Sequence, residues 1–486
     1  MERGFSNLVP KFKALHNVLA PVNKLPPEIL SQIPHSFPIR DLIALTQVCR
    51  YWRTTFISCG PLWCNIDCER VCEALTCLHR SKDSPIHVRV RKIPDDEVLT
   101  RLSQHIGRVK YLHLKPRWSV AQTVFARFTD SAPNLETLTI ICRPSTAAAG
   151  PVPSTLFTGN IPKLRSLTLE GLASDLAHFV LPNLTYFELS NVTSPPLSMS
   201  LSNLLTFLER SPLLESVRVD FHGACVQDAP RQMIVPLKAL KTLHISGSGL
   251  VGHGDNSFLA RLELPRGVDV TVMLLVIDGS PNAVARAIPP HPERLPFITG
   301  IRRIHIEVAP DHGRCTLRFS GENGKTTVMA RWQITNPDLE DIVMESIQSF
   351  LPLSTEGVEE FSILGYQAYS HLPALRAFES LLNLESIVMV HCDKIALLRA
   401  LRQPTRHVIA PKLRRIRLYL DPGKDASGEE LMDLVKYRAA NDVKLEEFLV
   451  ISPNVIIPVA EVMALKSYVR VVEYRMDDSV PNFKDQ

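Results

Sequence analysis

The sequence predicts an α+β chain in which a short, all-helical N-terminal module precedes an irregular α/β solenoid of repeats. Two patterns predict this fold class. Between residues 25 and 66, apolar residues recur in steps of three or four, as they do on one face of a helix. From about residue 108, a phrase of alternating apolar and polar residues returns at intervals of 20 to 32 residues within two runs, as in proteins built from stacked repeats.

The helical module begins at Pro26 and Pro27, which a helix accepts in its first turn because that turn needs no backbone donors. Glu28 adds a carboxylate near the positive end of the helix dipole. After a break at 35–38, one helix is predicted, with an apolar stripe formed by Leu42, Leu45, Cys49, Trp52 and Phe56. A module of roughly 45 residues is too short to bury this surface alone, so we expect the rest of the chain or a partner to cover it.

The repeated phrase has the form Leu-x-x-Leu-x-Leu. Its first apolar residue stands at Val109, Leu135, Leu164, Leu184, Leu214 and Leu240, alone at Ile301, and again at Val358, Leu384, Leu413 and Leu445. The closing alternation predicts a short strand, and prolines such as Pro133 and Pro162 precede several phrases, where the chain turns. Segments such as 201–210 suit a helix behind the strand. One such unit cannot bury its own core, whereas stacked units can.

The region 266–357 interrupts this period. Residues 315–319 and 326–330 flank Ser-Gly-Glu-Asn-Gly-Lys, which predicts a β-hairpin. In the last part of the chain we expect a helix at 429–440, a strand at 445–451 and another helix at 459–472. The predicted divisions are an extension (1–20), the helical module (21–70), a first run of repeats (71–265), the irregular region (266–357), a second run (358–476) and a tail (477–486).

Composition excludes several classes of partner. The 54 basic and 50 acidic side chains give a net charge of +4, which offers no argument for nucleic acid or membrane as a partner. No apolar run approaches the ~20 residues that span a bilayer, and the N-terminus lacks the pattern of a signal peptide. We therefore expect a cytoplasmic or nuclear protein whose ten cysteines are reduced thiols.

Several of these cysteines raise the question of zinc. Cys64, Cys68 and Cys72 follow one another at intervals of four, before Cys77 and His79, and a helix would place the first three on one side. Zinc sites usually need a second pair of ligands far along the chain, and the sequence has none. Buried thiols that pack as small apolar groups are the favoured interpretation, and no metal site is predicted.

No motif argues for catalysis, so neither catalytic residues nor a cofactor are predicted. Gly324-Lys325-Thr326 is the nearest approach to a nucleotide site. A phosphate-binding loop needs a glycine five residues earlier, where this chain has Phe319, and a helix afterwards, where a strand is predicted. The 16 histidines include no His-Glu-x-x-His pair. A hairpin turn is the favoured interpretation of this segment.

The outward positions of the repeat strands are candidates for binding a partner. They include Tyr186, Arg218, His244, Arg303, His305, Arg415 and Arg417. His113, His244 and His305 occupy the same slot of three repeats, and we expect all three at the surface. Arg302, Arg303 and His305 with Arg414, Arg415 and Arg417 offer a basic patch for an acidic or phosphorylated segment. A solvated face without a ligand is the alternative.

The helical stretch resembles an F-box, the module by which a protein docks onto a Skp-family adaptor. The matching residues are Leu25 to Leu30, Leu42, Leu45, residues 48–53 and Leu62-Trp63. A helical cap on a larger domain is the alternative. The phrase resembles a degenerate leucine-rich repeat, in which the usual Asn or Cys is replaced by Arg143, Leu172 and Val192, so irregular curvature is expected. Together these features resemble F-box proteins with degenerate leucine-rich repeats of the basidiomycete type.

This resemblance implies a non-catalytic, substrate-recognition subunit of a Skp–cullin–F-box ubiquitin ligase. The F-box would dock a Skp-family adaptor and through it a cullin, and the repeats would hold an unidentified target protein. The implied adaptor interface comprises Leu25, Pro26, Ile29, Leu30, Leu42, Leu45, Val48 and Trp52, some of which belong to the core behind it. Two alternatives remain: a leucine-rich-repeat scaffold without a ligase role, and an enzyme that binds ATP at Gly324-Lys325-Thr326.

Overall fold

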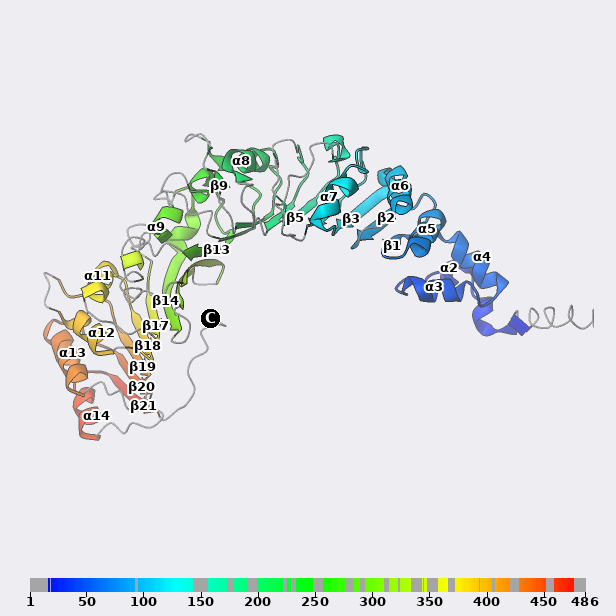
Figure 1. Cartoon of the computed structure of the whole chain (residues 1–486). Coiled ribbons are helices and arrows are strands. Elements are labelled where there is room, and N and C mark those ends of the chain that lie inside the picture. Colours follow the sequence, from blue (N-terminus) through cyan, green and yellow to red (C-terminus); the bar gives the residue numbers. More distant parts are fainter. Residues whose placement is uncertain are drawn as a thin grey trace, which may run out of the picture. The chain divides into compact units, whose positions relative to one another are not determined.

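The computed structural model forms two compact units, Met1–Leu189 and Ser190–Gln486 (Figure 1). The residues that it describes are 16–17, 19–91, 95–142, 156–172, 176, 179–190, 199–221, 225–226, 228, 233–247, 257–276, 283–288, 293–309, 314–321, 324–333, 343, 345–347, 357–365, 372–392, 394–403, 407–419, 428–451 and 459–475. The predicted extension lies almost entirely outside these residues, as does the predicted tail. The predicted division limits remain predictions.

The first unit begins with short helices. They are η1 (Pro21–Lys24), α2 (Pro27–Leu30), α3 (Ile39–Leu45), α4 (Arg50–Ser58) and η2 (Gly60–Trp63). The single helix predicted across residues 42–56 is wrong, because the chain breaks between α3 and α4. Cys49 has an extended backbone there, and its Sγ accepts the Trp52 N–H at 3.5 Å, which caps α4.

The same unit continues as strands that alternate with helices. The strands are β1 (Asn65–Asp67), β2 (Ile86–Val90), β3 (Val109–Leu114), β4 (Thr137–Ile141), β5 (Ser166–Glu170) and β6 (Tyr186–Ser190). The intervening helices are α5 (Val71–Arg80), α6 (Asp96–Gln104), η3 (Ile106–Arg108), α7 (Trp118–Phe125) and η4 (Leu156–Gly159). From β1 to β5, each strand pairs in parallel with the next one in the chain. Parallel neighbours joined by crossovers are what a stacked α/β repeat requires.

The second unit contains a longer series of strands. These are β7 (Met199–Ser200), β8 (Ser216–Phe221), β9 (Cys225–Val226), β10 (Val235–Pro236), β11 (Thr242–Gly247), β12 (Leu262–Glu263), β13 (Asp269–Val276), β14 (Ile301–Ala309), β15 (Arg314–Gly321), β16 (Thr326–Gln333), β17 (Glu360–Leu364), β18 (Ser386–Val390), β19 (Arg415–Tyr419), β20 (Glu447–Ile451) and β21 (Val471–Arg475). The helices are α8 (Leu201–Glu209), η7 (Leu259–Arg261), α9 (Ala283–Ala287), η8 (Pro296–Gly300), α11 (Leu372–Ser380), α12 (Lys394–Arg402), α13 (Gly428–Ala440) and α14 (Val459–Lys466). In Figure 1, α11 to α14 lie on one side of β17 to β21.

The predicted hairpin is confirmed, and it is built into the main sheet of this unit. β15 pairs antiparallel with both β14 and β16. β13 pairs in parallel with β16 rather than with β14, and β14 pairs in parallel with β17. The hairpin therefore occupies the place between β13 and β14, and the parallel series continues on either side of it.

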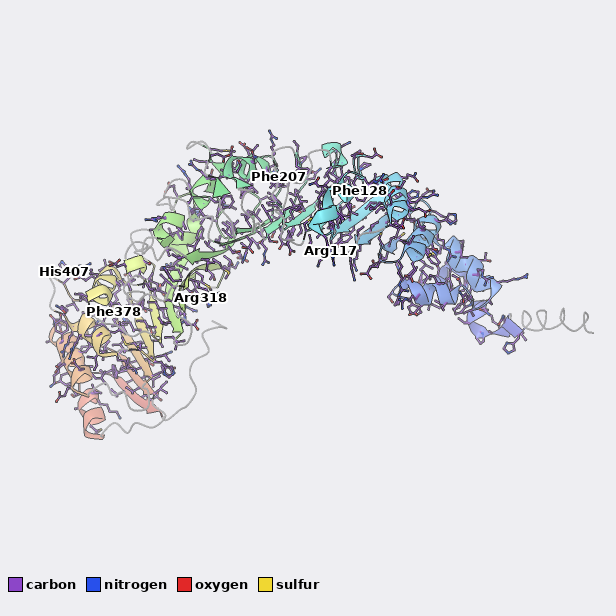
Figure 2. The ribbon with its side chains drawn as sticks, viewed as in Figure 1. Arg117, Phe128, Phe207, Arg318, Phe378 and His407 are labelled. Carbon is purple, nitrogen blue, oxygen red and sulfur yellow. The ribbon has the colours of Figure 1, made fainter. Side chains whose placement is uncertain are left out.

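The core lies between the strands and the helices. Phe128, Phe207 and Phe378, which Figure 2 labels, are all buried, and the Phe378 ring packs edge-on against Phe361 of β17 at 5.3 Å. The first apolar residue of each repeated phrase precedes its strand or begins it, and the strand then alternates between buried and less buried positions, as in β4, β5 and β6. The predicted α/β solenoid of leucine-rich-repeat type is therefore confirmed.

Some strands were not predicted, and a second helix prediction was partly wrong. The strand assignments missed β1, β2, β13 and β21 and the two-residue strands β7, β9, β10 and β12. The helix predicted at 459–472 ends at Lys466, and residues 471–475 form β21 parallel to β20 instead. Within the described residues, no helix is long and apolar enough to cross a membrane.

Candidate protein-binding surfaces

The N-terminal helical module has a small buried core. Leu30, Leu42, Phe56 and Trp63 are each at most 2 % exposed. The Trp63 indole N–H donates to the Phe56 carbonyl at 2.8 Å, so this ring is both buried and hydrogen-bonded. The core therefore holds the helices together, and Leu30 and Leu42 belong to it rather than to the surface.

Hydrogen bonds from side chains of α4 fix the start of the module. The Tyr51 hydroxyl donates to the Leu25 carbonyl at 2.6 Å, and the Trp52 indole N–H donates to the Asn23 side-chain oxygen. The Trp52 ring packs edge-on against Phe56, with 5.4 Å between the ring centroids. Trp52 and Leu25 are half-buried, and both already have contacts within the module.

Several large apolar side chains of this module remain exposed to solvent. Ile29 is 47 % exposed, Ile33 48 %, Phe37 44 % and Val48 56 %. Of the eight residues predicted for an adaptor interface, Pro26, Ile29 and Val48 are exposed, Leu25, Leu45 and Trp52 are half-buried, and Leu30 and Leu42 are buried. The prediction did not include Ile33 or Phe37, although Ile33 follows Ile29 at a helical spacing.

The module packs directly against the first repeat. The Arg80 guanidinium of α5 lies 4.4 Å from the Trp63 ring centroid, in cation–π geometry. The Lys82 ammonium donates to the Ser58 carbonyl at 3.0 Å. A Cβ at Gly60 would approach the Ser81 carbonyl oxygen to 2.9 Å, so only glycine fits this contact. The helical module and the first strands are thus joined by packed side chains.

The cysteines near this junction do not lie on one helix, as the zinc alternative supposed. Cys64 follows η2, Cys68 follows β1, and Cys72 and Cys77 lie on α5. Burial raises the pKa of the Cys68 and Cys77 thiols to about 12, which keeps both protonated. The buried-thiol interpretation is confirmed for Cys68 and Cys77, whereas Cys72 is exposed. Nowhere in the described ranges do three or more His, Cys, Asp or Glu residues cluster as a metal site would require.

The strand face of the first unit is polar, half-exposed and hollowed. A cavity of about 620 Å³ is lined by Asn65, Ile66, Asp67, His87, Arg89, Lys110, Tyr111, Glu136 and Thr137. The His87 and Tyr111 rings meet edge-on, with 6.2 Å between centroids. The prediction missed Asn65, Asp67, His87 and Arg89 because β1 and β2 do not carry the repeated phrase, whereas Lys110, Tyr111, Glu136 and Thr137 lie within two of the phrases. Tyr186, which it included, lies on β6 and donates to a Glu188 carboxylate oxygen at 2.8 Å.

The strand face of the second unit brings some of the predicted residues together. Arg218 of β8 and His244 of β11 are direct neighbours in register. Arg303 and His305 lie on β14, and Arg415 and Arg417 lie on β19, with β17 and β18 between those strands. The two halves of the predicted basic patch are therefore separated by two intervening strands.

The surface position expected for His305 is wrong. The side chain is 9 % exposed, and its Nδ1 lies 2.8 Å from the Ser362 hydroxyl oxygen on β17. Burial, and then the positive charge of Arg318, lowers the pKa of His305 to about 4, so the ring is neutral at physiological pH. Figure 2 labels Arg318 on the strand layer of this unit. His305 thus belongs to the interior of the sheet, whereas His113 and His244 are half-buried.

Glutamates neutralise the arginines of the predicted basic patch. The pairs are Arg302–Glu359 at 3.5 Å, Arg303–Glu360 at 3.6 Å, Arg414–Glu446 at 3.2 Å, Arg415–Glu385 at 4.0 Å and Arg417–Glu447 at 3.7 Å. Each of the five arginines of the predicted patch therefore has a carboxylate within 4.0 Å.

Gly324-Lys325-Thr326 forms the turn and strand that the favoured interpretation expected. Gly324 has a φ of +67°, which suits a tight turn, and Thr326 begins β16. A strand, β16 (Thr326–Gln333), follows the turn directly, where a phosphate-binding loop would need the N-terminus of a helix. Lys325 and Thr326 help to line a cavity of about 730 Å³, which Arg302 also lines, but Arg302 is already paired with Glu359.

In the comparison with known proteins, a family model matches the N-terminal module. Residues 22–69 match the family described as F-box-like. No curated protein matches the chain. The matched residues contain the buried core and the exposed apolar side chains described above. The chain therefore carries an F-box-like domain at residues 22–69, followed by a long, mostly parallel series of strands of the repeat type.

Proposed function

We propose that this protein is the substrate-recognition subunit of a Skp–cullin–F-box ubiquitin ligase. The observation that carries the proposal is the F-box-like match at residues 22–69, within which large apolar side chains remain exposed. A soluble surface rarely gathers such side chains without a partner that covers them. The Skp-family adaptor would cover them, and a cullin would join through that adaptor.

The adaptor interface would centre on the exposed members of the predicted set. Pro26, Ile29 and Val48 would enter the interface, together with Ile33 and Phe37, and Leu25, Leu45 and Trp52 would lie at its margin. Leu30 and Leu42 would support the interface from the core. Burial of an apolar side chain contributes roughly 1.5–3 kcal/mol when it is complete, so a few such residues suffice for a stable complex.

The repeats would hold the target protein through their strand faces. The chain itself would perform no chemistry, because its contribution is to hold the target beside the ubiquitin-charged enzyme. The packed junction between the F-box-like domain and the first repeat suits this role. It keeps adaptor and target in a fixed geometry, which a loose tether would not.

Co-purification of the full chain with a Skp-family adaptor tests the proposal. We expect a stoichiometric complex, and we expect the double variant Ile29→Glu/Val48→Glu to lose about 100-fold or more in affinity, because two half-exposed apolar residues become charged. Val180→Glu is the matched control, since Val180 is 55 % exposed in the same unit but lies outside residues 22–69.

Failure of the well-folded wild-type chain to bind any Skp-family adaptor would overturn the ligase proposal. The protein would then act as a repeat scaffold whose helical module caps its own repeats. An equal loss of affinity in Val180→Glu and in the double variant would show that the module's exposed side chains are not the interface.

A further inference from the structure

Basic side chains gather on the strand face of the first unit, at the C-terminal ends of β2 and β3. Register places Asp67, Arg89, His113 and Thr139 side by side on β1 to β4. Side chains two residues apart on a strand share a face. Arg91 and Lys115, two residues beyond Arg89 and His113, therefore extend this face. We name Arg89, Arg91, His113 and Lys115 the basic cluster.

The basic cluster carries more positive than negative charge. Asp67 faces it, with a carboxylate oxygen 3.8 Å from the Arg91 guanidinium, and both side chains are more than 40 % exposed. The basic cluster thus holds three permanent cations, one of which, Arg91, is paired with Asp67. Burial, and then the charges of Lys115, Arg89 and Arg91, lowers the pKa of His113, which places all three cations close to the imidazole.

This arrangement differs from that of the arginines in the second unit. There, each of the five arginines of the predicted patch lies within 4.0 Å of a glutamate. In the basic cluster, by contrast, one contact within 4.0 Å, between Arg91 and Asp67, joins a cation of the described residues to a carboxylate. Arg117, which Figure 2 labels below α7, is exposed two residues beyond Lys115 and adds to the same end of β3.

The cavity of about 620 Å³ on this face leads to the basic cluster. Its floor follows the preceding row of the sheet, in which Asn65, His87, Tyr111 and Thr137 are neighbours in register. Arg89 and Asp67 line one part of it, and the ion pair of Lys110 and Glu136, at 3.1 Å, lines another. Four strands at about 4.8 Å spacing span roughly 14 Å, which matches four or five residues of extended peptide.

We propose that this groove and the basic cluster bind an extended, acidic segment of a partner protein, whose Asp or Glu side chains supply carboxylates to these cations. Arginine binds carboxylates in bidentate geometry, and an exposed pair of arginines is suited to two such side chains. We favour a carboxylate over a phosphate as the group that is bound, because Asp67 faces the basic cluster. Its negative charge would repel a phosphate dianion more strongly than a carboxylate monoanion. On the proposed ligase function, this segment would belong to the target protein.

Selection from a random dodecapeptide library against the full chain tests this inference. We expect the selected peptides to carry two or more Asp or Glu residues close together. We expect Arg89→Gln/Arg91→Gln to weaken their binding at least 30-fold, measured by fluorescence anisotropy, and higher salt to weaken it further. Both side chains are exposed, so circular dichroism should show an unchanged fold.

Arg415→Gln/Arg417→Gln is the matched control, because it removes the same charge from the second unit. We expect it to change peptide affinity by less than twofold. Selection of no peptide, selection of peptides without acidic residues, or equal affinity for both double variants would overturn the inference. Tenfold tighter binding after replacement of the acidic residues by phosphoserine would also overturn it, by reassigning the cluster to phosphate.

The adaptor measurement separates this inference from the proposed function. Arg89→Gln/Arg91→Gln should leave affinity for the Skp-family adaptor unchanged, whereas Ile29→Glu/Val48→Glu should abolish adaptor binding and leave peptide binding intact. A chain that binds the acidic peptides but no adaptor would retain the acidic-segment site and lose the ligase role. A chain that binds the adaptor but no acidic peptide would retain the ligase role and lose the acidic-segment site.

Discussion

The outward strand faces of the two units differ in burial and in charge balance. On β4, β5 and β6 of the first unit, these positions are half-buried and alternate with a buried row. On β14, β17, β18 and β20 of the second unit, His305, Ser362, Val388 and Leu449 are all buried. The arginines of the second face are matched by glutamates, whereas the basic cluster of the first has one facing carboxylate. The difference in burial is confined to some strands of the second unit, because β11, β13 and β19 alternate between buried and less buried positions as β4, β5 and β6 do.

Val388→Asp should have the largest effect among the variants that test this contrast. Val388 is 6 % exposed between Ser362 and Arg417 in register, so a carboxylate there would lose its solvation. We expect the free energy of unfolding to fall by about 4 kcal/mol. Thr139→Asp, at a half-buried position of the first unit, should cost less than about 1 kcal/mol. Chemical denaturation measures both, and equal costs would refute the difference between the faces.

Arg438→Met compares a buried arginine with a half-exposed counterpart in the first unit. Arg438 donates to the Ile409, Ala410 and Leu413 carbonyls at 3.2, 3.0 and 3.1 Å and is fully buried. Burial lowers the pKa of Arg438 to about 10, so it remains a cation at neutral pH. We expect a loss of about 3 kcal/mol in unfolding free energy, because three acceptors lose their donor.

Arg108→Met is the corresponding change in the first unit. Arg108 donates to the Leu78 and Ser84 carbonyls and to the Ser81 hydroxyl, but water can reach this side chain in part. Replacement of Arg108 should lower the free energy of unfolding less than replacement of Arg438 does. An exposed control on α13, Lys436→Met, should change stability by less than about 0.5 kcal/mol. A larger cost for Arg108 than for Arg438 would contradict the comparison.

His305 makes the stability of the protein sensitive to acid. Its pKa of about 4 lies below the ordinary value of 6.5, so the unfolded chain binds a proton first as the pH falls. The stabilisation is present above pH 6.5 and is lost as the pH falls toward 4. By linkage, the loss at pH 4.5 relative to pH 8 is about 2.5 kcal/mol.

His305→Asn should remove this pH dependence while leaving a side chain that can bond the Ser362 hydroxyl. Denaturation curves at pH 4.5, 6 and 8 measure the effect. His113→Asn in the first unit is the control, and its effect should be smaller because that ring is only half-buried. An unchanged slope between pH 4.5 and 6.5 in His305→Asn would show that the ring titrates normally.

Arg414→Gln should have the smallest effect. The Arg414 guanidinium lies 3.2 Å from a Glu446 carboxylate oxygen, and both side chains are more than half exposed. Ion pairs with that exposure contribute little to stability. We expect the free energy of unfolding to change by less than 1 kcal/mol and the affinity for acidic peptides to stay the same. A substantial loss of acidic-peptide binding would move the binding surface from the first unit to the second.

The positions of most strands and of the F-box-like module can be predicted from local sequence patterns. The repeated phrase and the Pro-Pro-Glu start of α2 are local patterns, and local patterns carry enough information to place a strand or a helix start. The short strands β1 and β2 carry no such phrase, and residues 471–472 fell within the helix predicted at 459–472, whereas Val471–Arg475 form a strand that pairs with β20. The sequence therefore missed the strands on which the basic cluster begins.

Which side chains are available for binding depends on the tertiary structure. Leu30 and Ile29 are adjacent in the chain and equally apolar, yet one is in the core and the other is 47 % exposed. Arg303 and Arg417 find their glutamates 57 and 30 residues away. Charge balance and burial depend on strands that are distant in the chain but neighbours in the sheet, and no local pattern encodes that pairing.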